Sequence, residues 1–201
     1  MQRVEHTPAF LLHQRPWGDN GRIFELFTRG HGRLSVFARG VRGANAKLAG
    51  VLQPFLPLLV SWAGRGEAPR LTGAELDGSV IGRTPIPQPR LMSAWYMSEL
   101  VLSLTARHDP QPELYDHYRQ ALDDLRGAPS LERTLRLFEK RLLDVLGYGL
   151  TDLFDARFDD QAELARLKPQ LRQALANCLE GRSLRTRDVA QSLRDFGRAH
   201  R

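Results

Sequence analysis

The sequence of 201 residues contains a single cysteine, Cys178. One cysteine cannot form a disulfide within the chain, and a zinc ribbon built from several thiolates is excluded as well. Cys178 lies in an apolar-periodic stretch, which predicts a small buried side chain. The six histidines are scattered without the spacing of metal ligands, so we expect no bound metal.

Long hydrophobic runs are also missing. The longest run, from Phe55 to Val60, contains Pro57 and is far shorter than the roughly 20 residues of a membrane-spanning helix. The first residues, 1–7, lack the apolar core of a signal peptide. We therefore expect a cytoplasmic protein that does not enter a membrane.

No catalytic signature is present either. The sequence has no P-loop, no Rossmann glycine fingerprint and no Gly-x-Ser-x-Gly elbow, so we expect neither an enzyme nor a cofactor. Two acidic groups could bind magnesium for a nuclease, although acids at helix starts and on solvated loops are far more common. These groups are Asp123 with Asp124, and Asp152, Asp155, Asp159 and Asp160.

Acidic residues are absent from the whole interval between Glu25 and Glu67. The chain as a whole carries 29 Lys and Arg against 23 Asp and Glu, a formal net charge of +6. A basic, acid-free segment rich in β-forming residues fits a polyanion better than a small-molecule substrate. The cations inside the interval are Arg29, Arg33, Arg39, Arg42, Lys47 and Arg65.

A second group of arginines lies near the C-terminal end. This group either lengthens a nucleic-acid footprint or belongs to a solvated tail. Asp188 and Asp195 reduce its net positive charge, so both interpretations stay open. Its members are Arg182, Arg185, Arg187, Arg194, Arg198 and Arg201.

The first third of the chain predicts short strands separated by glycine-rich turns. About five strands in about 75 residues are typical of a small closed barrel, of which the OB-fold is the common five-stranded example. The expected strands are 9–13, 22–28, 34–38, 55–62 and a short one near Arg70. Trp17 and Trp62 are expected to be core or packing residues.

Three prolines at positions 85, 87 and 89 mark a boundary, after which the pattern becomes helical. Ser130 is the expected N-cap of one helix, and Pro169 is expected to break or kink another. The predicted helices are 91–104, a helix that starts near Asp109 and ends at Gly127, 131–146, 161–179 and 188–196. The expected fold is thus α+β with two domains, an OB-fold barrel over 1–84 and an all-α helical bundle over 85–201.

Short motifs over nearly the whole chain match one bacterial family in the same order. Each motif is weak alone, but the ordered set is specific, and on it the chain resembles the RecO family of recombination mediators. The motifs are Arg15-Pro16-Trp17, Leu26-Phe27-Thr28, Gly32-Arg33-Leu34, Ala38-Arg39-Gly40-Val41-Arg42, Leu52-Gln53-Pro54-Phe55, Gly64-Arg65-Gly66-Glu67, Tyr96-Met97-Ser98-Glu99-Leu100, Phe138-Glu139 with Leu146-Gly147-Tyr148-Gly149, and Gly181-Arg182-Ser183-Leu184-Arg185-Thr186-Arg187.

The resemblance implies an OB-fold followed by a helical domain, which the residue pattern predicts independently. It also implies a protein that binds single- and double-stranded DNA and anneals complementary strands. Such proteins work with RecR and single-strand binding protein to load the recombinase RecA, so these are the expected partners, in the bacterial cytoplasm at the nucleoid. Many members hold zinc with four cysteines after the Gly-Tyr-Gly element, but residues 151–160 contain none here. Structural zinc and a zinc ribbon therefore do not carry over.

On the barrel we expect a DNA-binding face whose cations neutralise phosphates. Strand alternation places Phe37 on the same side of its strand as Arg33 and Arg39. Leu34, Val36 and Ala38 lie on the other side. Phe37 then either stacks on a base or points into the barrel. The expected DNA-binding residues are Arg33, Phe37, Arg39, Arg42, Lys47 and Arg65.

On the helical domain the pattern indicates an apolar groove rimmed by cations, suited to an acidic peptide that ends in a hydrophobic residue and a carboxylate. The resemblance implies that the tail of single-strand binding protein binds there. The candidate residues are Trp95, Tyr96, Leu100, Arg136 and Lys140. The same side chains would fit a plain bundle core. A protein-protein adaptor with an incidental basic barrel, or a magnesium-dependent nuclease, stays open as an alternative.

Overall fold

The computed structural model describes residues 3–19, 21–39, 50–150 and 157–189. The chain forms two compact units, and they are interleaved in the sequence. The first unit comprises Met1–Thr84 and Thr105–Asp116, and the second comprises Pro85–Leu104 and His117–Arg201. The chain therefore leaves the first unit, contributes one helix to the second, and returns for twelve residues before it leaves again.

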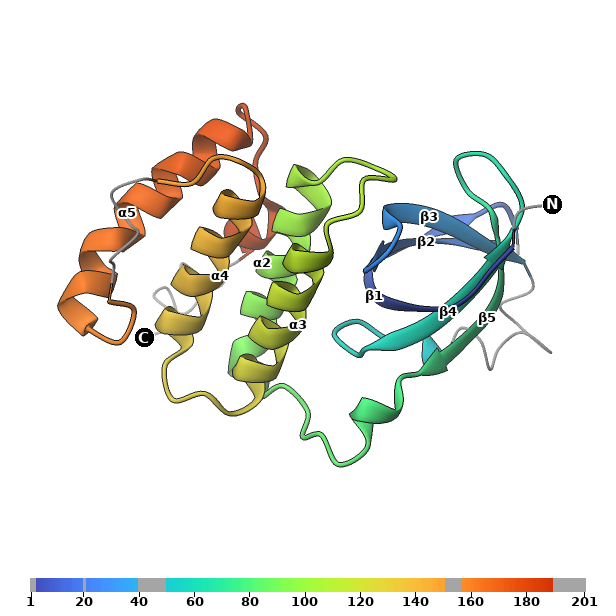
Figure 1. The fold of residues 1–201 in the computed structure, drawn as a ribbon, viewed down its shortest axis with the longest axis horizontal. Helices are drawn as coiled ribbons and strands as arrows, with labels where there is room; N and C mark the ends of the chain where they lie inside the picture. Colours follow the sequence, from blue (N-terminus) through green and yellow to red (C-terminus); the bar gives the residue numbers. More distant parts are fainter. Residues whose placement is uncertain (1–2, 20, 40–49, 151–156, 190–201) are drawn as a thin grey trace, which may run out of the picture. The chain divides into compact units, whose positions relative to one another are not determined.

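Five strands form a closed barrel in the first unit, in the order β1-β2-β3-β5-β4 (Figure 1). Neighbouring strands are antiparallel except β3 and β5, which are parallel. This arrangement confirms the predicted OB-fold. The strands are β1 (Arg3–Trp17), β2 (Gly21–Thr28), β3 (Gly32–Arg39), β4 (Leu58–Ala63) and β5 (Arg70–Leu76).

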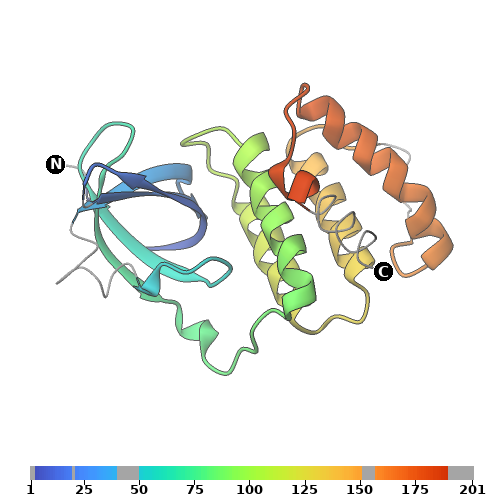
Figure 2. The same ribbon diagram turned by 180° about the vertical axis from the view of Figure 1, so that it is seen from behind.

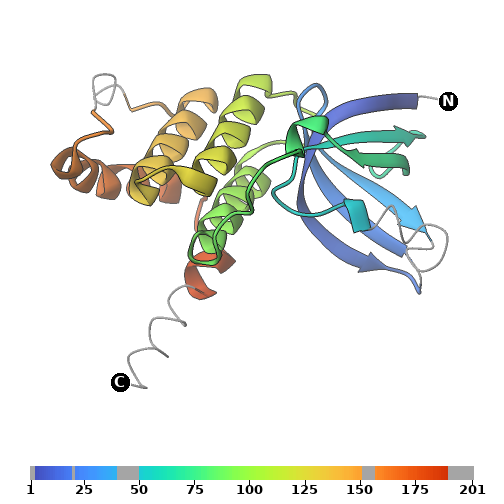
Figure 3. The same ribbon diagram turned by 90° about the horizontal axis from the view of Figure 1, so that it is seen from below.

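Strand β1 is much longer than the five residues expected from the sequence. Its first half pairs with β4 and its second half pairs with β2, so one curved strand serves both neighbours (Figure 3). The register shifts between Val4 and Thr7 and again between Leu11 and His13. Such bulges bend a strand and increase its twist, which lets β1 follow the barrel wall.

The barrel interior is filled by side chains that alternate along the strands. Leu34, Val36 and Ala38 point inward, on the side opposite Phe37 as the alternation indicated, and Trp62 is 6% exposed, which confirms its expected place in the core. Burying these apolar side chains is the main stabilising contribution to the barrel. The core consists of Ala9, Leu11, Phe24, Leu26, Leu34, Val36, Ala38, Leu52, Leu58, Val60, Trp62 and Leu71.

The returning segment Thr105–Asp116 covers part of β3. Among the described residues, β3 pairs with β5 at one position, Phe37 opposite Arg70. Further back along β3, Arg33 forms a bridge with Arg107, and the backbone N–H of His108 donates to the carbonyl of Arg33 at 2.9 Å. The segment thereby satisfies backbone groups that the β3 edge would otherwise expose.

Side chains of the returning segment also contact the outside of the barrel. The ring of Tyr115 lies 5.2 Å from that of Phe10 and 5.7 Å from that of Phe27. The guanidinium of Arg29 donates two hydrogen bonds to the carboxylate of Asp116, at 3.0 and 2.9 Å. The barrel unit is therefore completed by residues that follow the first helix of the other unit.

Helices make up the second unit, with α3 contributing its first residues to the barrel unit. Ser130 caps α4 as predicted, since its hydroxyl accepts from the backbone N–H of Arg133 at 3.2 Å. Helix α5 runs on through Pro169, so of the predicted break or kink at this proline the break is wrong. The elements are η1 (Gly78–Val80) in the first unit, then α2 (Gln88–Leu104), α3 (Pro112–Gly127), α4 (Leu131–Val145) and α5 (Gln161–Cys178).

Two details explain these differences from the predicted helices. The buried stripe of Leu164, Leu167, Leu171 and Leu175 holds α5 on both sides of the proline, and packing of this kind outweighs one lost backbone hydrogen bond. Helix α2 starts three residues earlier than predicted, because a proline is tolerated in the first turn of a helix.

The helical unit is held together by a mixed apolar and polar interior. The hydroxyls of Ser98 and Tyr118 lie 2.7 Å apart, and the ring of Tyr118 is 6.1 Å from that of Phe138. Residues 185–189 form a further helical turn beside α2, earlier than the predicted start at Asp188 (Figure 2). Among the described helices, none combines the length and the apolar character that crossing a bilayer requires.

Replacing Gly32 with alanine should destabilise the barrel unit. Gly32 has a φ of +66°, and a Cβ there would overlap the backbone carbonyl of Asp109 and lie 2.7 Å from its nitrogen. The positive φ and the overlap together should reduce the free energy of unfolding by at least about 2 kcal/mol, as measured by urea denaturation.

Gly30→Ala is the matched control, because a Cβ at Gly30 meets no atom within 4 Å. It should change the same free energy by less than about 1 kcal/mol. Equal losses in the two variants would contradict a role for the contact between Gly32 and Asp109.

Candidate functional site

The outer face of the barrel contains a buried ionic cluster. The carboxylate of Glu25, whose side chain is 7% exposed, lies 2.9 Å from the guanidinium of Arg107 and 3.6 Å from that of Arg33. The hydroxyl of Ser35 donates to the same carboxylate at 2.6 Å and also accepts from Arg107. A buried carboxylate needs such partners, because its transfer out of water is otherwise costly.

Arg33 belongs to this cluster and not to an exposed cationic face. Its side chain is 13% exposed, and its guanidinium donates to the carbonyl of Thr105 at 2.9 and 3.3 Å. Burial of the guanidinium is the largest effect that lowers the pKa of Arg33, and the nearby positive charge of Arg107 lowers it further. The placement favours a structural role for Arg33, as a tie between β3 and the returning segment.

The other end of the same face carries an exposed aromatic and cationic group. The ring of Trp17, 41% exposed, lies 5.5 Å from that of Phe37. The guanidinium carbon of Arg39 lies 5.6 Å from the centre of the Trp17 ring, a cation–π arrangement. We call Trp17, Phe37 and Arg39 the aromatic–arginine cluster.

The strand register explains how these side chains meet. Trp17, Gly21 and Arg39 lie in one row across β1, β2 and β3, and Phe37 lies opposite Ile23 two residues along. A Cβ on Gly21 would be 3.0 Å from the Trp17 ring, so the glycine leaves the space that this ring occupies. The sequence correctly indicated the side of β3 on which Phe37 lies.

Other expected DNA-binding residues are either beside this end of the barrel or outside the described residues. Arg65 is exposed in the turn between β4 and β5, and Arg70, at the end of that turn, pairs with Phe37. Arg42 and Lys47 lie outside the described residues.

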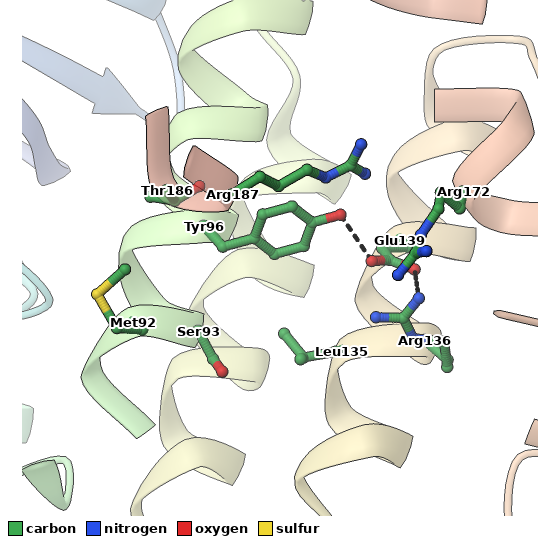
Figure 4. A pocket seen from close by; sticks show the side chains of 9 residues that line it. All are labelled: Met92, Ser93, Tyr96, Leu135, Arg136, Glu139, Arg172, Thr186 and Arg187. Atoms are coloured by element: carbon green, nitrogen blue, oxygen red, sulfur yellow. Dashed lines mark hydrogen bonds and ion pairs between the residues drawn. The ribbon is translucent and has the colours of Figure 1, made fainter. Parts of the chain in front are cut away.

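The helical unit contains a pocket of approximately 200 Å³ (Figure 4). Tyr96 and Arg136, both expected at a peptide site, line it together. Figure 4 shows guanidinium groups from three separate elements beside the carboxylate of Glu139. The lining residues come from α2 (Met92, Ser93, Tyr96), α4 (Leu135, Arg136, Glu139), α5 (Arg172) and the turn 185–189 (Thr186, Arg187).

Glu139 organises the interior of this pocket. It is 1% exposed, accepts a hydrogen bond from the hydroxyl of Tyr96 at 2.7 Å, and lies 2.8 Å from the guanidinium of Arg136. Burial raises the pKa of Glu139, and the charges of Arg136, Arg187 and Arg172 oppose that effect. Three arginines around one carboxylate leave the pocket with a net positive charge, which suits an anionic ligand.

The other expected peptide-site residues do not line this pocket. Leu100 is fully buried in the unit's core, and Lys140 forms an ion pair with Asp144. Trp95 is 37% exposed on α2, but outside the pocket lining. Of the five residues expected at a peptide site, two therefore line this pocket, together with Arg172 and Arg187, which were not expected there.

The acidic groups considered for a nuclease have structural partners where they are described. Asp160 caps α5, and Asp159 forms an ion pair with Arg133. Asp123 pairs with Arg126, and Asp124 accepts from Gln120. Within the described ranges, no three His, Cys, Asp or Glu side chains gather as they would around a metal ion. Asp152 and Asp155 lie outside those ranges.

Comparison with known proteins matches both units to one family. The family model "Recombination protein O N terminal" matches residues 1–80, and "Recombination protein O C terminal" matches residues 89–170. DNA repair protein RecO of Methylococcus capsulatus is 35% identical over 231 aligned positions, which cover 94% of this chain and 94% of that protein. The chain belongs to the RecO family.

Other RecO proteins match a shorter part of their own length. RecO of Alkalilimnicola ehrlichii is 45% identical over 153 residues, 76% of this chain and 59% of that protein. RecO of Chromobacterium violaceum is 41% identical over 147 residues, 73% of this chain and 59% of that protein. The chain thus spans about three fifths of these two RecO relatives.

The raised pKa of Glu139 predicts a pH-dependent stability effect. A carboxyl whose pKa in the folded state exceeds its ordinary value of 4.5 contributes stability that is present below pH 4.5 and is lost as the pH rises through the folded-state pKa. Glu139→Gln removes this titration and keeps an acceptor for Tyr96. The variant should therefore gain stability relative to the wild type as the pH rises above 4.5, measured by urea unfolding at a series of pH values.

Glu132→Gln is the control of opposite sign. A hydrogen bond from Lys168, the largest cause, lowers the pKa of Glu132. Its contribution is present above the ordinary pKa of 4.5 and is lost as the pH falls below it, so this variant should be less stable than the wild type above pH 4.5, and the difference should shrink as the pH falls further. Parallel trends in the two variants would show that the assigned directions are wrong.

Proposed function

We propose that this RecO family member is a DNA repair and recombination mediator without catalytic activity, which binds single- and double-stranded DNA through its barrel and anneals complementary strands. The aromatic–arginine cluster is the observation that carries this proposal. Curated relatives that the chain matches are named DNA repair proteins, which supports the same role.

The cluster offers the two kinds of contact that single-stranded DNA needs. The rings of Trp17 and Phe37 present π-faces on which bases can stack regardless of sequence. Arg39 and Arg65 supply positive charge for phosphates, and releasing the counterions of those phosphates favours binding. The loops after β1 and between β4 and β5, which flank this cluster, are the loops that OB-folds use for oligonucleotides.

Annealing follows from the same contacts. Cations on the barrel would screen the repulsion between two phosphate backbones while their bases pair. Base pairing supplies the free energy, so no nucleotide hydrolysis is required, in agreement with the absence of a P-loop from the sequence.

The pocket of the helical unit supports a partner of a different kind. Its three arginines and apolar lining suit an acidic peptide with a terminal carboxylate, and we propose the C-terminal tail of single-strand binding protein as that peptide. Docking there would bring the protein to coated strands, where, together with RecR, it helps to load RecA.

Charge reversal at Arg39 should weaken DNA binding in a salt-dependent manner. If Arg39 contacts a phosphate, Arg39→Glu should reduce the slope of log affinity against log salt for single-stranded DNA by about 0.7 or more. The measurement is fluorescence anisotropy of a labelled oligonucleotide across a salt series. Arg166→Glu on α5 makes the same charge change and should leave the slope unaltered, because Arg166 pairs with Glu163 in the other unit. A slope equal to that of the wild type in folded Arg39→Glu protein would refute the barrel site and favour a pure adaptor.

Removal of the Trp17 ring should weaken binding without changing the salt slope. Loss of one stacked base costs about 1–3 kcal/mol, so Trp17→Ala should bind single-stranded DNA roughly 5- to 150-fold more weakly at every salt concentration. In the same titration, the plot of log affinity against log salt for this variant should be parallel to that of the wild type. Wild-type affinity in this variant would exclude Trp17 from the interface even if Arg39 contributes.

A further inference from the structure

The carboxylate of Glu99 holds the start of the last described helical turn. Its oxygens accept from the backbone N–H of Arg185 at 2.7 Å, from that of Thr186 at 2.9 Å, and from the hydroxyl of Thr186 at 2.6 Å. The first N–H groups of a helix have no partner within the helix, and a Ser, Thr, Asp or Asn side chain at the adjacent position usually accepts from one of them. Here the acceptor is 86 residues away in the chain.

Further contacts fix the same segment to the helical unit. The guanidinium of Arg182 donates to the carbonyl of Ser103, at the end of α2, at 3.0 Å. Leu184 is 2% exposed, so its side chain is anchored in the unit's interior. The segment 182–187 therefore has a defined position on α2, with Glu99 as its acceptor at the helix start.

That position determines one side of the pocket. Thr186 and Arg187 line the pocket, whereas Glu99 does not. The guanidinium carbon of Arg187 lies 5.8 Å from the centre of the Tyr96 ring, and Figure 4 shows it beside the Tyr96 hydroxyl and above Glu139. Tyr96 and Glu99 lie one helical turn apart on α2, so the same face of this helix lines the pocket and binds the segment.

We propose that Glu99 is a positioning residue for the pocket, which holds Arg187 in place to contact the anionic group of a bound acidic peptide. This inference rests on the proposed peptide-binding function of the pocket. It assigns a shared role to two motifs, one around Tyr96 and Glu99 and the other from Gly181 to Arg187, that DNA binding by the barrel leaves unexplained.

The sign of the effect distinguishes positioning from simple electrostatics. Removing the negative charge of Glu99 makes the helical unit more positive, which by itself strengthens the binding of an acidic peptide. Loss of the three hydrogen bonds releases Arg187 from its position and weakens binding. A weaker complex in spite of the more favourable net charge therefore indicates positioning.

The probe is a fluorescent peptide of about ten residues, rich in aspartate and ending in phenylalanine with a free carboxylate, measured by anisotropy on the full chain. Glu99→Ala should bind it about tenfold more weakly, the loss expected when one charge-assisted hydrogen bond disappears. Glu99→Gln retains one acceptor oxygen and should fall between this variant and the wild type. Glu163→Ala, which removes a carboxylate paired with Arg166, should bind as tightly as the wild type or more tightly.

A double-mutant cycle with Arg187→Ala tests the assigned route. In the Arg187→Ala background, Glu99→Ala should cause no further weakening, because the side chain that it positions is already gone. Additive losses in the double mutant would refute the proposal. Binding as tight as that of the wild type, or tighter, in Glu99→Ala would refute it as well. If Glu99→Ala does not fold, Glu99→Gln takes its place in this comparison. Failure of the wild-type chain to bind the peptide would instead reject the proposed function of the pocket itself.

Discussion

One buried carboxylate determines which part of the outer barrel face is accessible to solvent. Glu25 lies within the wall formed by β2 and β3, and its charge is balanced by Arg33 and Arg107. Arg107 belongs to the returning segment, so balancing the charge also brings that segment over the β3 edge. The covered end of the face becomes structural, and the opposite end, around Trp17, stays accessible.

Arginine therefore has two separate roles on one strand. Arg33 and Arg39 both project from the outer side of β3, six residues apart, yet one is enclosed by protein acceptors and the other lies over an exposed ring. Planar guanidinium groups suit both situations, because they can satisfy a buried acceptor or stack on an aromatic ring. Net charge alone overstates the size of the basic surface, since part of it neutralises the protein's own acid.

The fold could largely be predicted from local patterns. The alternation of Leu34, Val36 and Ala38 separated the two sides of β3 correctly, and Ser130 marked the start of α4. These features depend on neighbours within a few residues, which is the range that periodicity and capping report. The span of α5 was also predicted, but the expected break at Pro169 was wrong, because the helix is held on both sides of the proline by the packing of its buried leucines.

The sites were harder to predict because their partners are distant in the sequence. The burial of Arg33 depends on Thr105 and Arg107, more than 70 residues later, and no local pattern contains that information. The pocket likewise takes Arg172 and Arg187 from elements far from Tyr96. The exposed cluster was partly visible, since alternation placed Phe37 beside Arg39, but the packing of Trp17 on Phe37 needed the register across β1, β2 and β3.

The interleaving of the two units affects how the chain folds while it is being synthesised. Domains usually fold one after another as they emerge from the ribosome. Here the barrel strands are all made by Leu76, but the segment that neutralises Glu25 follows only after α2, a helix of the other unit, has been made. Until residue 107 emerges, the nascent barrel carries an acid without one of its two arginine partners. Completion of the first unit is thus tied to the synthesis of the beginning of the second.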